Sequence, residues 1–306
     1  GAIGHICSYL IRDLGVFFPK SNIVMIDNMM TQRFSSLFHL PLSANYSFIE
    51  GDVSQMNLKS VFLGADIVIH LAAITDAAGS IDKAEELEAN NFKSTLRVAE
   101  ACIEADASLI ALSSTSVYGT QKEQVDENCD DSELQPQSPY ATTKLKEEEL
   151  IASLSKEKGL KAIHCRFGTI FGASQGMRFH TAVNKFCWQA VMNQPISVWS
   201  TAYNQKRPYL DLLDASRAIA FIINNNIFDG QIYNILTSNA TVKQVVDTIK
   251  EFVPNLEIEF VDNRIMNQLS YEVLCERFKS QGFVFSGNMR RGIKETIDLL
   301  KHANHK

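Results

Sequence analysis

The sequence lacks several features that would mark other classes of protein. No stretch approaches the ~18 apolar residues of a membrane-spanning helix. Positive charge is not in excess, and a net charge of −6 argues against broad nucleic-acid binding. The six cysteines are scattered without a C-x-x-C pair, so we expect reduced thiols and no metal site. We also expect no signal peptide, and together these absences predict a cytoplasmic protein.

Short apolar runs that alternate with amphipathic stretches are present in the first half of the chain. Such alternation is typical of βαβ units, so we predict an α/β fold with a doubly wound parallel sheet. The expected strands are residues 22–26, 46–49, 67–70, 109–112 and 162–166, and the expected helices are 8–14, 84–105 and 140–156.

The second half of the chain is more mixed and predicts a smaller domain. Segment 173–208 is rich in Gln, Asn and aromatic residues and is expected to form loops and a helix, whereas 241–253 and 287–303 look helical. We place the boundary between the two domains after residue 168, with some later segments returning to the first domain. The sequence shows no repeat and no long linker.

Two glycines at the start have the spacing of a phosphate-binding turn that opens a helix, here expected over 6–14. The third glycine position of G-x-x-G-x-x-G is Cys7, which is small enough but departs from the pattern. Such a turn normally follows a buried strand, so we expect that the first strand is missing and that the natural chain begins further upstream. An ordinary glycine turn is the alternative. The residues assigned to pyrophosphate binding are Gly1, Gly4, His5 and Ile6.

A carboxylate ends the next apolar run. Asp27 lies 23 residues after Gly4, where an acid accepts hydrogen bonds from an adenosine ribose. A carboxylate there would repel a 2′-phosphate, and the next basic residue, Arg33, is rather far along the chain, so the pattern favours NAD over NADP. We assign Asp27 and Asn28 to this site; an aspartate that only shapes a turn is the alternative.

Three further segments are expected to line the same site. Residues 51–53 follow a strand and can contact adenine, and the small residues after His70 let a cofactor approach the backbone. An amide inside the helix 84–105 needs a partner and can brace the neighbouring strand. His70 itself is expected to be a core histidine. The residues assigned are Asp52, Val53, Leu71, Ala72, Ala73 and Asn91.

Hydroxyl side chains follow the expected strand 109–112. In an open α/β sheet, ligands bind beyond the carboxyl ends of the strands, so a hydroxyl at this place can hydrogen-bond a substrate hydroxyl. We select Ser114, which lies 26 residues before Tyr140. An ordinary serine-rich loop is the alternative.

Tyr140 and Lys144 lie about one helical turn apart and so share a helix face. Ser138 as N-cap and Pro139 as the first helical residue predict that the helix begins here. An unperturbed phenol titrates near ~10, and an adjacent ammonium favours the phenolate and brings its pKa toward the working range of a base. A half-buried tyrosine beside a solvated lysine is the alternative.

Taken together and in this order, these segments resemble the extended short-chain dehydrogenase/reductases that act on nucleotide sugars, with UDP-galactose 4-epimerase and its relatives as the nearest pattern. The resemblance covers nearly the whole chain. It extends through 166–172, through 206–214, which is similar to R-D-Y-x-x-V-x-D, and through 232–235, which is similar to Y-N-x-G. It implies a Rossmann NAD-binding domain over 1–168 and mainly a nucleotide-sugar domain over 169–306.

The resemblance also implies roles for single residues. Tyr140 would be the catalytic base, Lys144 would tune the phenol pKa and anchor the cofactor ribose, and Ser114 would bind the reacting sugar oxygen. Arg207 matches an arginine that contacts the nucleotide diphosphate. The implied substrate contacts are Thr115, Thr169, Arg178, Asn184, Arg207 and Arg264.

The loop after Ser114 separates reactions within this family. Sugar 4,6-dehydratases carry Asp-Glu before Val-Tyr-Gly and glucuronate decarboxylases carry Glu, whereas this chain has Thr115 and Ser116. Epimerisation at C4 needs only hydride removal to NAD and its return to the other face of a 4-keto sugar, so an epimerase is favoured. A dehydratase, a decarboxylase, a reductase and a non-enzymatic Rossmann-like binding protein are the alternatives. Thr169 for Asn and Pro208 for Asp leave the sugar and the nucleotide open.

The resemblance finally implies a C2 homodimer, in which the helices after Ala84 and Tyr140 pair with their symmetry mates. The alternative is that their apolar residues pack only on the sheet. The apolar stripe expected at this interface consists of Leu87, Leu96, Val98, Ala99, Leu145, Leu150 and Ile151.

Overall fold

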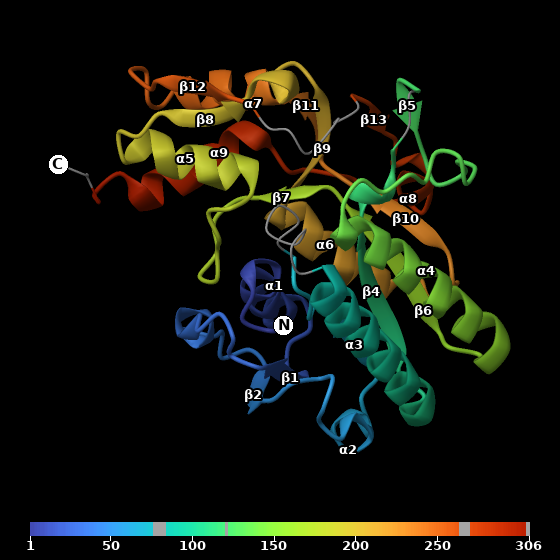
Figure 1. Cartoon of the computed structure of the whole chain (residues 1–306). Coiled ribbons are helices and arrows are strands. Elements are labelled where there is room, and N and C mark those ends of the chain that lie inside the picture. The colour runs from blue at the N-terminus through green and yellow to red at the C-terminus, as the bar shows by residue number, and fades with distance from the viewer. Residues whose placement is uncertain (76–83, 120–121, 263–269, 304–306) are drawn as a thin grey trace.

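The computed structural model describes residues 1–75, 84–119, 122–262 and 270–303. A larger unit of parallel strands flanked by helices lies beside a smaller group of helices and short strands (Figure 1). Across the described ranges, none of the helices combines the length and the apolar character needed to cross a membrane.

A four-stranded parallel sheet forms the centre of the larger unit, and a parallel pair of strands lies beside it. The order in the sheet is β10 (Ile232–Ile235), β6 (Ala162–Phe167), β4 (Ser108–Ser114) and β3 (Ile67–His70), and the pair is β1 (Asn22–Asp27) with β2 (Asn45–Glu50). The five expected strands are confirmed within two residues at each end. The runs form strands because every residue of β6 and most of β4 are buried, as in a sheet covered on both faces.

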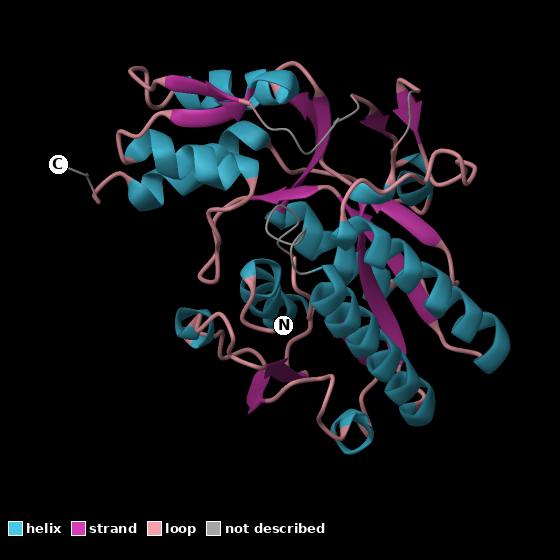
Figure 2. Ribbon diagram, in the orientation of Figure 1, coloured by secondary structure: helices cyan, strands magenta, loops and turns pink. Residues whose placement is uncertain are grey.

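Helices cover both faces of this sheet (Figure 2). On one face α3 and α4 pack side by side, and Val98 and Ile151 join Leu109 in a buried cluster. On the other face Leu10 of α1 and Ile219 of α6 are in a second cluster. The doubly wound α/β prediction is therefore confirmed. The helices of this unit are α1 (His5–Phe17), α2 (Leu58–Phe62), α3 (Ala84–Ala105), α4 (Pro139–Lys158) and α6 (Leu212–Asn224).

The start of α4 follows from local sequence. The Ser138 side chain accepts a hydrogen bond from the Ala141 backbone N–H at 3.2 Å, and Pro139 is the first helical residue. The helix ends at Gly159, whose φ of 70° suits glycine. These signals set the register of the face that carries Tyr140 and Lys144.

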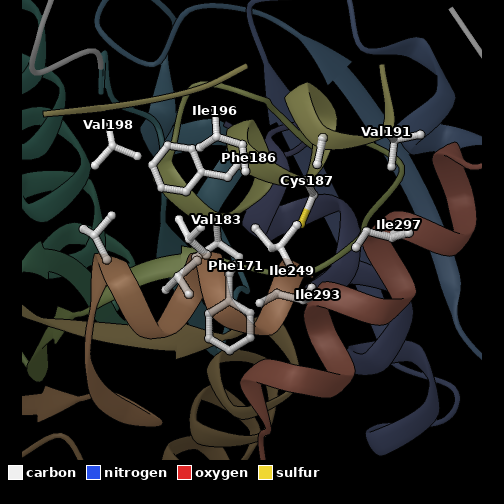
Figure 3. Packing of buried hydrophobic residues seen from close by; sticks show 14 of the residues in the cluster. Phe171, Val183, Phe186, Cys187, Val191, Ile196, Val198, Ile249, Ile293 and Ile297 are labelled. Carbon is white, nitrogen blue, oxygen red and sulfur yellow. The ribbon is translucent and has the colours of Figure 1, made fainter. Parts of the chain in front are cut away.

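The smaller unit has its own core, in which Phe171, Ile249 and Ile293 meet (Figure 3). The expected helices at 241–253 and 287–303 are found as α7 and α9. The prediction of loops and one helix over 173–208 is wrong in part, because β8 and the start of β9 also lie there; their strand partners come from residues distant in sequence. The elements are β7 (Thr169–Phe171), α5 (Ala182–Val191), β8 (Ile196–Trp199), β9 (Lys206–Asp211), β11 (Ser238–Thr241), α7 (Val242–Lys250), β12 (Ile258–Val261) and α9 (Met289–Leu300). A strand pair, β5 (Gln124–Val125) with β13 (Glu272–Val273), and α8 (Glu276–Ser280) lie nearer the larger unit.

The expected apolar stripe on α3 and α4 is largely wrong. Four of its seven residues are at most 1% exposed within the chain itself, so they cannot form an interface with another subunit. The reason is that α3 and α4 turn these side chains toward their own core. The four are Leu87, Val98, Ala99 and Ile151, while Leu96, Leu145 and Leu150 are partly buried.

Candidate functional site

A cleft with a volume of about 180 Å³, open to solvent, lies at the carboxyl ends of β1 and β3 and the start of α1. It brings together most of the residues that the sequence assigned to cofactor binding, although they come from four separate segments. Asn91, Tyr140 and Lys144 do not line it. The assigned residues that do are Gly1, Gly4, His5, Ile6, Asp27, Asn28, Asp52, Val53, Leu71, Ala72 and Ala73.

The glycine turn lies against the end of β3. A Cβ on Gly1 would lie 2.6 Å from the Leu71 carbonyl oxygen, so only glycine allows this approach. Gly4 is the N-cap of α1, and no side chain caps the helix there. The N-terminus of α1 therefore faces the cleft without a capping group. These features fit a pyrophosphate, because backbone N–H groups and the helix dipole favour an anion there.

Asp27 connects the turn to the end of β1. Its Oδ2 accepts from the Ile3 N–H at 3.2 Å and its Oδ1 accepts from the Met29 N–H at 2.9 Å, and the residue is 7% exposed. It also lines the cleft, so a ribose could reach it. The argument that Arg33 is too distant in sequence is wrong, because Arg33 lines the same cleft and donates to the Gly176 carbonyl at 3.0 Å.

The bracing role expected of Asn91 is confirmed. Its Oδ1 accepts from the Ile74 N–H at 2.8 Å and its Nδ2 donates to the Ile74 carbonyl at 2.9 Å, which fixes the backbone that follows β3. His70 is a core histidine, as expected. Its Nε2 lies 3.2 Å from Thr95 Oγ1, and burial lowers its pKa to about 3, so it is neutral.

Tyr140 and Lys144 share one face of α4, and the Lys144 ammonium lies 5.9 Å from the Tyr140 ring centroid. Lys144 is only 5% exposed, so the alternative of a solvated lysine is wrong. Lys144 lowers the phenol pKa, as expected, but burial raises it more, and the net direction in this structure is upward. The ammonium donates to Glu147 Oε2 at 2.8 Å, a partner that the sequence reasoning missed although it lies three residues on.

Ser114 ends β4 and caps the short 3₁₀ turn η3 (Thr115–Val117), against which α4 packs. Its Oγ accepts from the Ser116 N–H at 3.1 Å and from Ser116 Oγ at 2.9 Å. Thr115 is buried, and its hydroxyl donates to the Phe167 carbonyl at 3.2 Å. Ser114 therefore has a fixed position beside α4, whereas the hydroxyl of Thr115 faces the neighbouring strand β6 and not an open site.

The residues expected to contact substrate do not all gather at the cleft. Among those that the structure describes, only Arg178 lines it, where the guanidinium donates to Thr75 Oγ1. Asn184 is fully buried and is bound to both the N–H and the carbonyl of Gly172, each at 3.2 Å, so its predicted substrate contact is wrong. Thr169 begins β7 and is partly buried.

Arg207 lies on β9, away from the cleft lining. Its guanidinium is 6.0 Å from the Tyr271 ring centroid and donates to Gln205 Oε1 at 2.9 Å. This position leaves its predicted diphosphate contact a prediction. Arg264 lies outside the described residues.

A second buried ion pair lies beside the first on α4. Arg166 of β6 binds Glu148 through two hydrogen bonds of 2.9 and 2.6 Å and also donates to the Tyr118 hydroxyl at 2.9 Å. Both charged side chains are at most 4% exposed. The pair joins the helix of Tyr140 to the central sheet, and no pattern in the sequence indicated it.

Comparison with known proteins shows the family to which the chain belongs. The model of the NAD dependent epimerase/dehydratase family matches residues 1–235. Among curated proteins, the chain is 28% identical over 311 residues to the trifunctional UDP-glucose 4,6-dehydratase/UDP-4-keto-6-deoxy-D-glucose 3,5-epimerase/UDP-4-keto-L-rhamnose-reductase RHM1 of Arabidopsis thaliana, covering 97% of this chain and 46% of that protein. The chain thus spans about half the length of that relative.

Two further comparisons cover both proteins more evenly. The uncharacterized UDP-glucose epimerase YtcB of Bacillus subtilis is 28% identical over 262 residues, which are 82% of this chain and 79% of YtcB. The solved UDP-glucuronic acid 4-epimerase from Bacillus cereus, in complex with UDP-glucuronic acid and NAD, superimposes with a TM-score of 0.90 over 99% of this chain and 98% of that one. Its sequence identity is 22%, so this likeness shows the fold.

Proposed function

Because the chain belongs to the NAD dependent epimerase/dehydratase family, and NAD is therefore its cofactor, we propose that it epimerises a nucleotide-diphosphate sugar at C4 through a transient 4-keto sugar. The observation that carries the choice of reaction is the turn η3 after Ser114. Thr115 and Ser116 bear no carboxyl group, and their hydroxyls bind Phe167 and Ser114. Elimination of water needs an acid and a base in addition to the group that deprotonates the sugar 4-hydroxyl, whereas epimerisation needs only that one group.

The proposed chemistry assigns one task to each of three side chains. Tyr140 Oη takes the proton of the sugar 4-hydroxyl and returns it when the 4-keto sugar has turned in the pocket. Ser114 Oγ hydrogen-bonds the reacting sugar oxygen. The Lys144 ammonium stabilises the Tyr140 phenolate, which burial and the neighbouring Glu147 carboxylate disfavour. Bound in the cleft lined by Gly1, Gly4 and Asp27, NAD would supply reversible hydride transfer at C4 of the sugar.

A dehydratase is the second candidate, because the chain is similar over 97% of its length to a part of RHM1, whose name includes a 4,6-dehydratase. The deciding experiment incubates the purified protein with a panel of UDP-, GDP-, dTDP- and CDP-sugars and identifies the products by NMR. A C4 epimer with no loss of water supports the proposal. A 4-keto-6-deoxy product would overturn it in favour of dehydration.

Asp27→Ala should weaken NAD binding about tenfold or more and reduce discrimination against NADP, because a charge-assisted hydrogen bond is worth about 1.5–3 kcal/mol. The carboxylate also holds the glycine turn through Ile3. Titration of both cofactors by fluorescence checks the prediction, with the exposed Asp66→Ala as matched control. Equal or tighter NADP binding by the unaltered protein would contradict the role given to Asp27.

We also propose that the protein is a C2 homodimer that pairs the outer sides of α3 and α4, where Leu96, Leu145 and Leu150 are only partly buried. Light scattering at micromolar concentration should give twice the monomer mass of 34.2 kDa. A monomeric mass would reject the dimer.

We also propose that the protein works in a reducing compartment such as the cytoplasm. All six cysteines are free thiols, and five of them are buried. Burial raises the pKa of Cys7 and of Cys275 to about 11, so these thiols are unreactive at neutral pH.

A further inference from the structure

Glu147 is a buried carboxylate that the proposed reaction does not use. It lies one turn after Lys144 on α4, is 4% exposed, and accepts a hydrogen bond from Lys144 Nζ at 2.8 Å through Oε2. Its other oxygen, Oε1, is buried and has no hydrogen-bond partner in the part of the chain that the structure describes. Keeping a carboxylate half-satisfied in the interior costs free energy, which indicates a role other than stability.

The position of Glu147 connects it to the phenol through the lysine. The Lys144 ammonium lies 2.8 Å from the Glu147 carboxylate and 5.9 Å from the centroid of the Tyr140 ring. An ammonium alone would favour the phenolate, but a carboxylate in contact with it offsets much of its field. Burial raises the pKa of Tyr140, Lys144 opposes this, and Glu147 adds to it.

The other charged groups around Lys144 cannot take this role. Glu148 is neutralised by its two hydrogen bonds to Arg166 of β6. Burial lowers the pKa of His70 on β3 to about 3 and that of His164 on β6 to about 4, so both stay neutral where a phenol titrates. Two further groups are cations and so cannot offset the Lys144 charge: Arg178 in the loop after β7, which lowers the pKa of Tyr140, and the amino group of Gly1, which lowers that of His70.

We propose that Glu147 is a positioning residue: its carboxylate holds the Lys144 ammonium and weakens its support of the phenolate, so that Glu147 sets the pH range in which Tyr140 acts as a base. The inference rests on the proposed function for the role of Tyr140. Burial lowers the pKa of Lys144 and Glu147 raises it. While Lys144 stays protonated, loss of the Glu147 charge stabilises the phenolate, the phenol pKa falls, and the acid limb of the kcat profile moves to lower pH.

The kinetic test compares three variants of the full chain with bound NAD. Glu147→Gln keeps the shape and an acceptor but removes the charge, and should move the acid limb of kcat down by about one pH unit. Glu147→Asp keeps the charge but shortens the side chain by one methylene, which withdraws the carboxylate from Lys144. It should give a smaller shift in the same direction. Glu149→Gln changes an exposed residue of the same helix and should leave the profile unchanged. A Glu147→Gln profile that is lower at every pH but parallel to the unaltered one would overturn the inference.

A second measurement needs no substrate. Tyrosinate absorbance is titrated in each variant, and the curve of the matching Tyr140→Phe protein is subtracted to isolate this phenol. A downward shift in Glu147→Gln with no turnover of any nucleotide sugar would support the inference and reject the proposed function; turnover with no shift in either measurement would do the reverse. If Glu147→Gln does not fold by circular dichroism, the Glu147→Asp titration decides, and the absence of a shift there overturns the inference.

Discussion

Tyr140→Phe should lower kcat by about 10²–10⁴-fold, the usual range for loss of a general base. The phenylalanine ring keeps the packing of the original side chain beside Lys144, so the fold and the content of bound NAD should not change. The measurement is kcat on the nucleotide sugar that the panel identifies, with cofactor content determined for each preparation. Tyr203→Phe, a tyrosine that packs on Phe260 in the smaller unit, is the matched control and should keep full activity.

Two neighbouring variants show whether the three side chains act together. Lys144→Ala should reduce kcat and also loosen NAD, because the lysine is assigned to both the phenol and the ribose. Ser114→Ala should have a milder effect, since it removes one hydrogen bond of about 0.5–1.5 kcal/mol net. Losses in double variants should be smaller than the sum of the single ones. If Tyr140→Phe kept most of its activity, this assignment of the base would be wrong.

Glu148→Ala should lower the free energy of unfolding by about 3–5 kcal/mol, because it leaves the Arg166 guanidinium buried without its partner. The two hydrogen bonds of 2.9 and 2.6 Å and the burial of both side chains make this the largest single loss of stability that we expect outside the apolar core. Urea unfolding followed by circular dichroism should show a lower midpoint with an unchanged slope.

The exposed neighbour provides the control for this stability effect. Glu149→Ala removes the same side chain from the next position of α4 and should change the free energy of unfolding by no more than about 0.5 kcal/mol. Replacing both partners, Glu148→Leu with Arg166→Met, should recover part of the loss, since no charge is then left unpaired. A Glu148→Ala protein as stable as the Glu149→Ala protein would show that the pair contributes little.

Much of the fold and part of the site could be predicted from sequence, because the signals are local. Continuous apolar runs between amphipathic stretches predicted the five strands, and the strand ends then located Asp27 and Ser114. Ser138 and Pro139 predicted the start of α4 from capping chemistry within four residues. The turn at Gly1 and the bracing amide of Asn91 were recognised in the same way, since each depends on one residue type at one place along a strand or a helix.

The tertiary structure alone decided which of these residues meet, because pairing between distant segments leaves no periodic signal in the chain. It placed Arg33 in the cleft wall and tied Asn184 to the backbone of Gly172. It buried most of the expected dimer stripe within the chain, because the sides of α3 and α4 that carry these residues face the chain's own interior. It also buried Lys144 with Glu147, and a charge contact of 2.8 Å in the interior is stronger than the same contact in water.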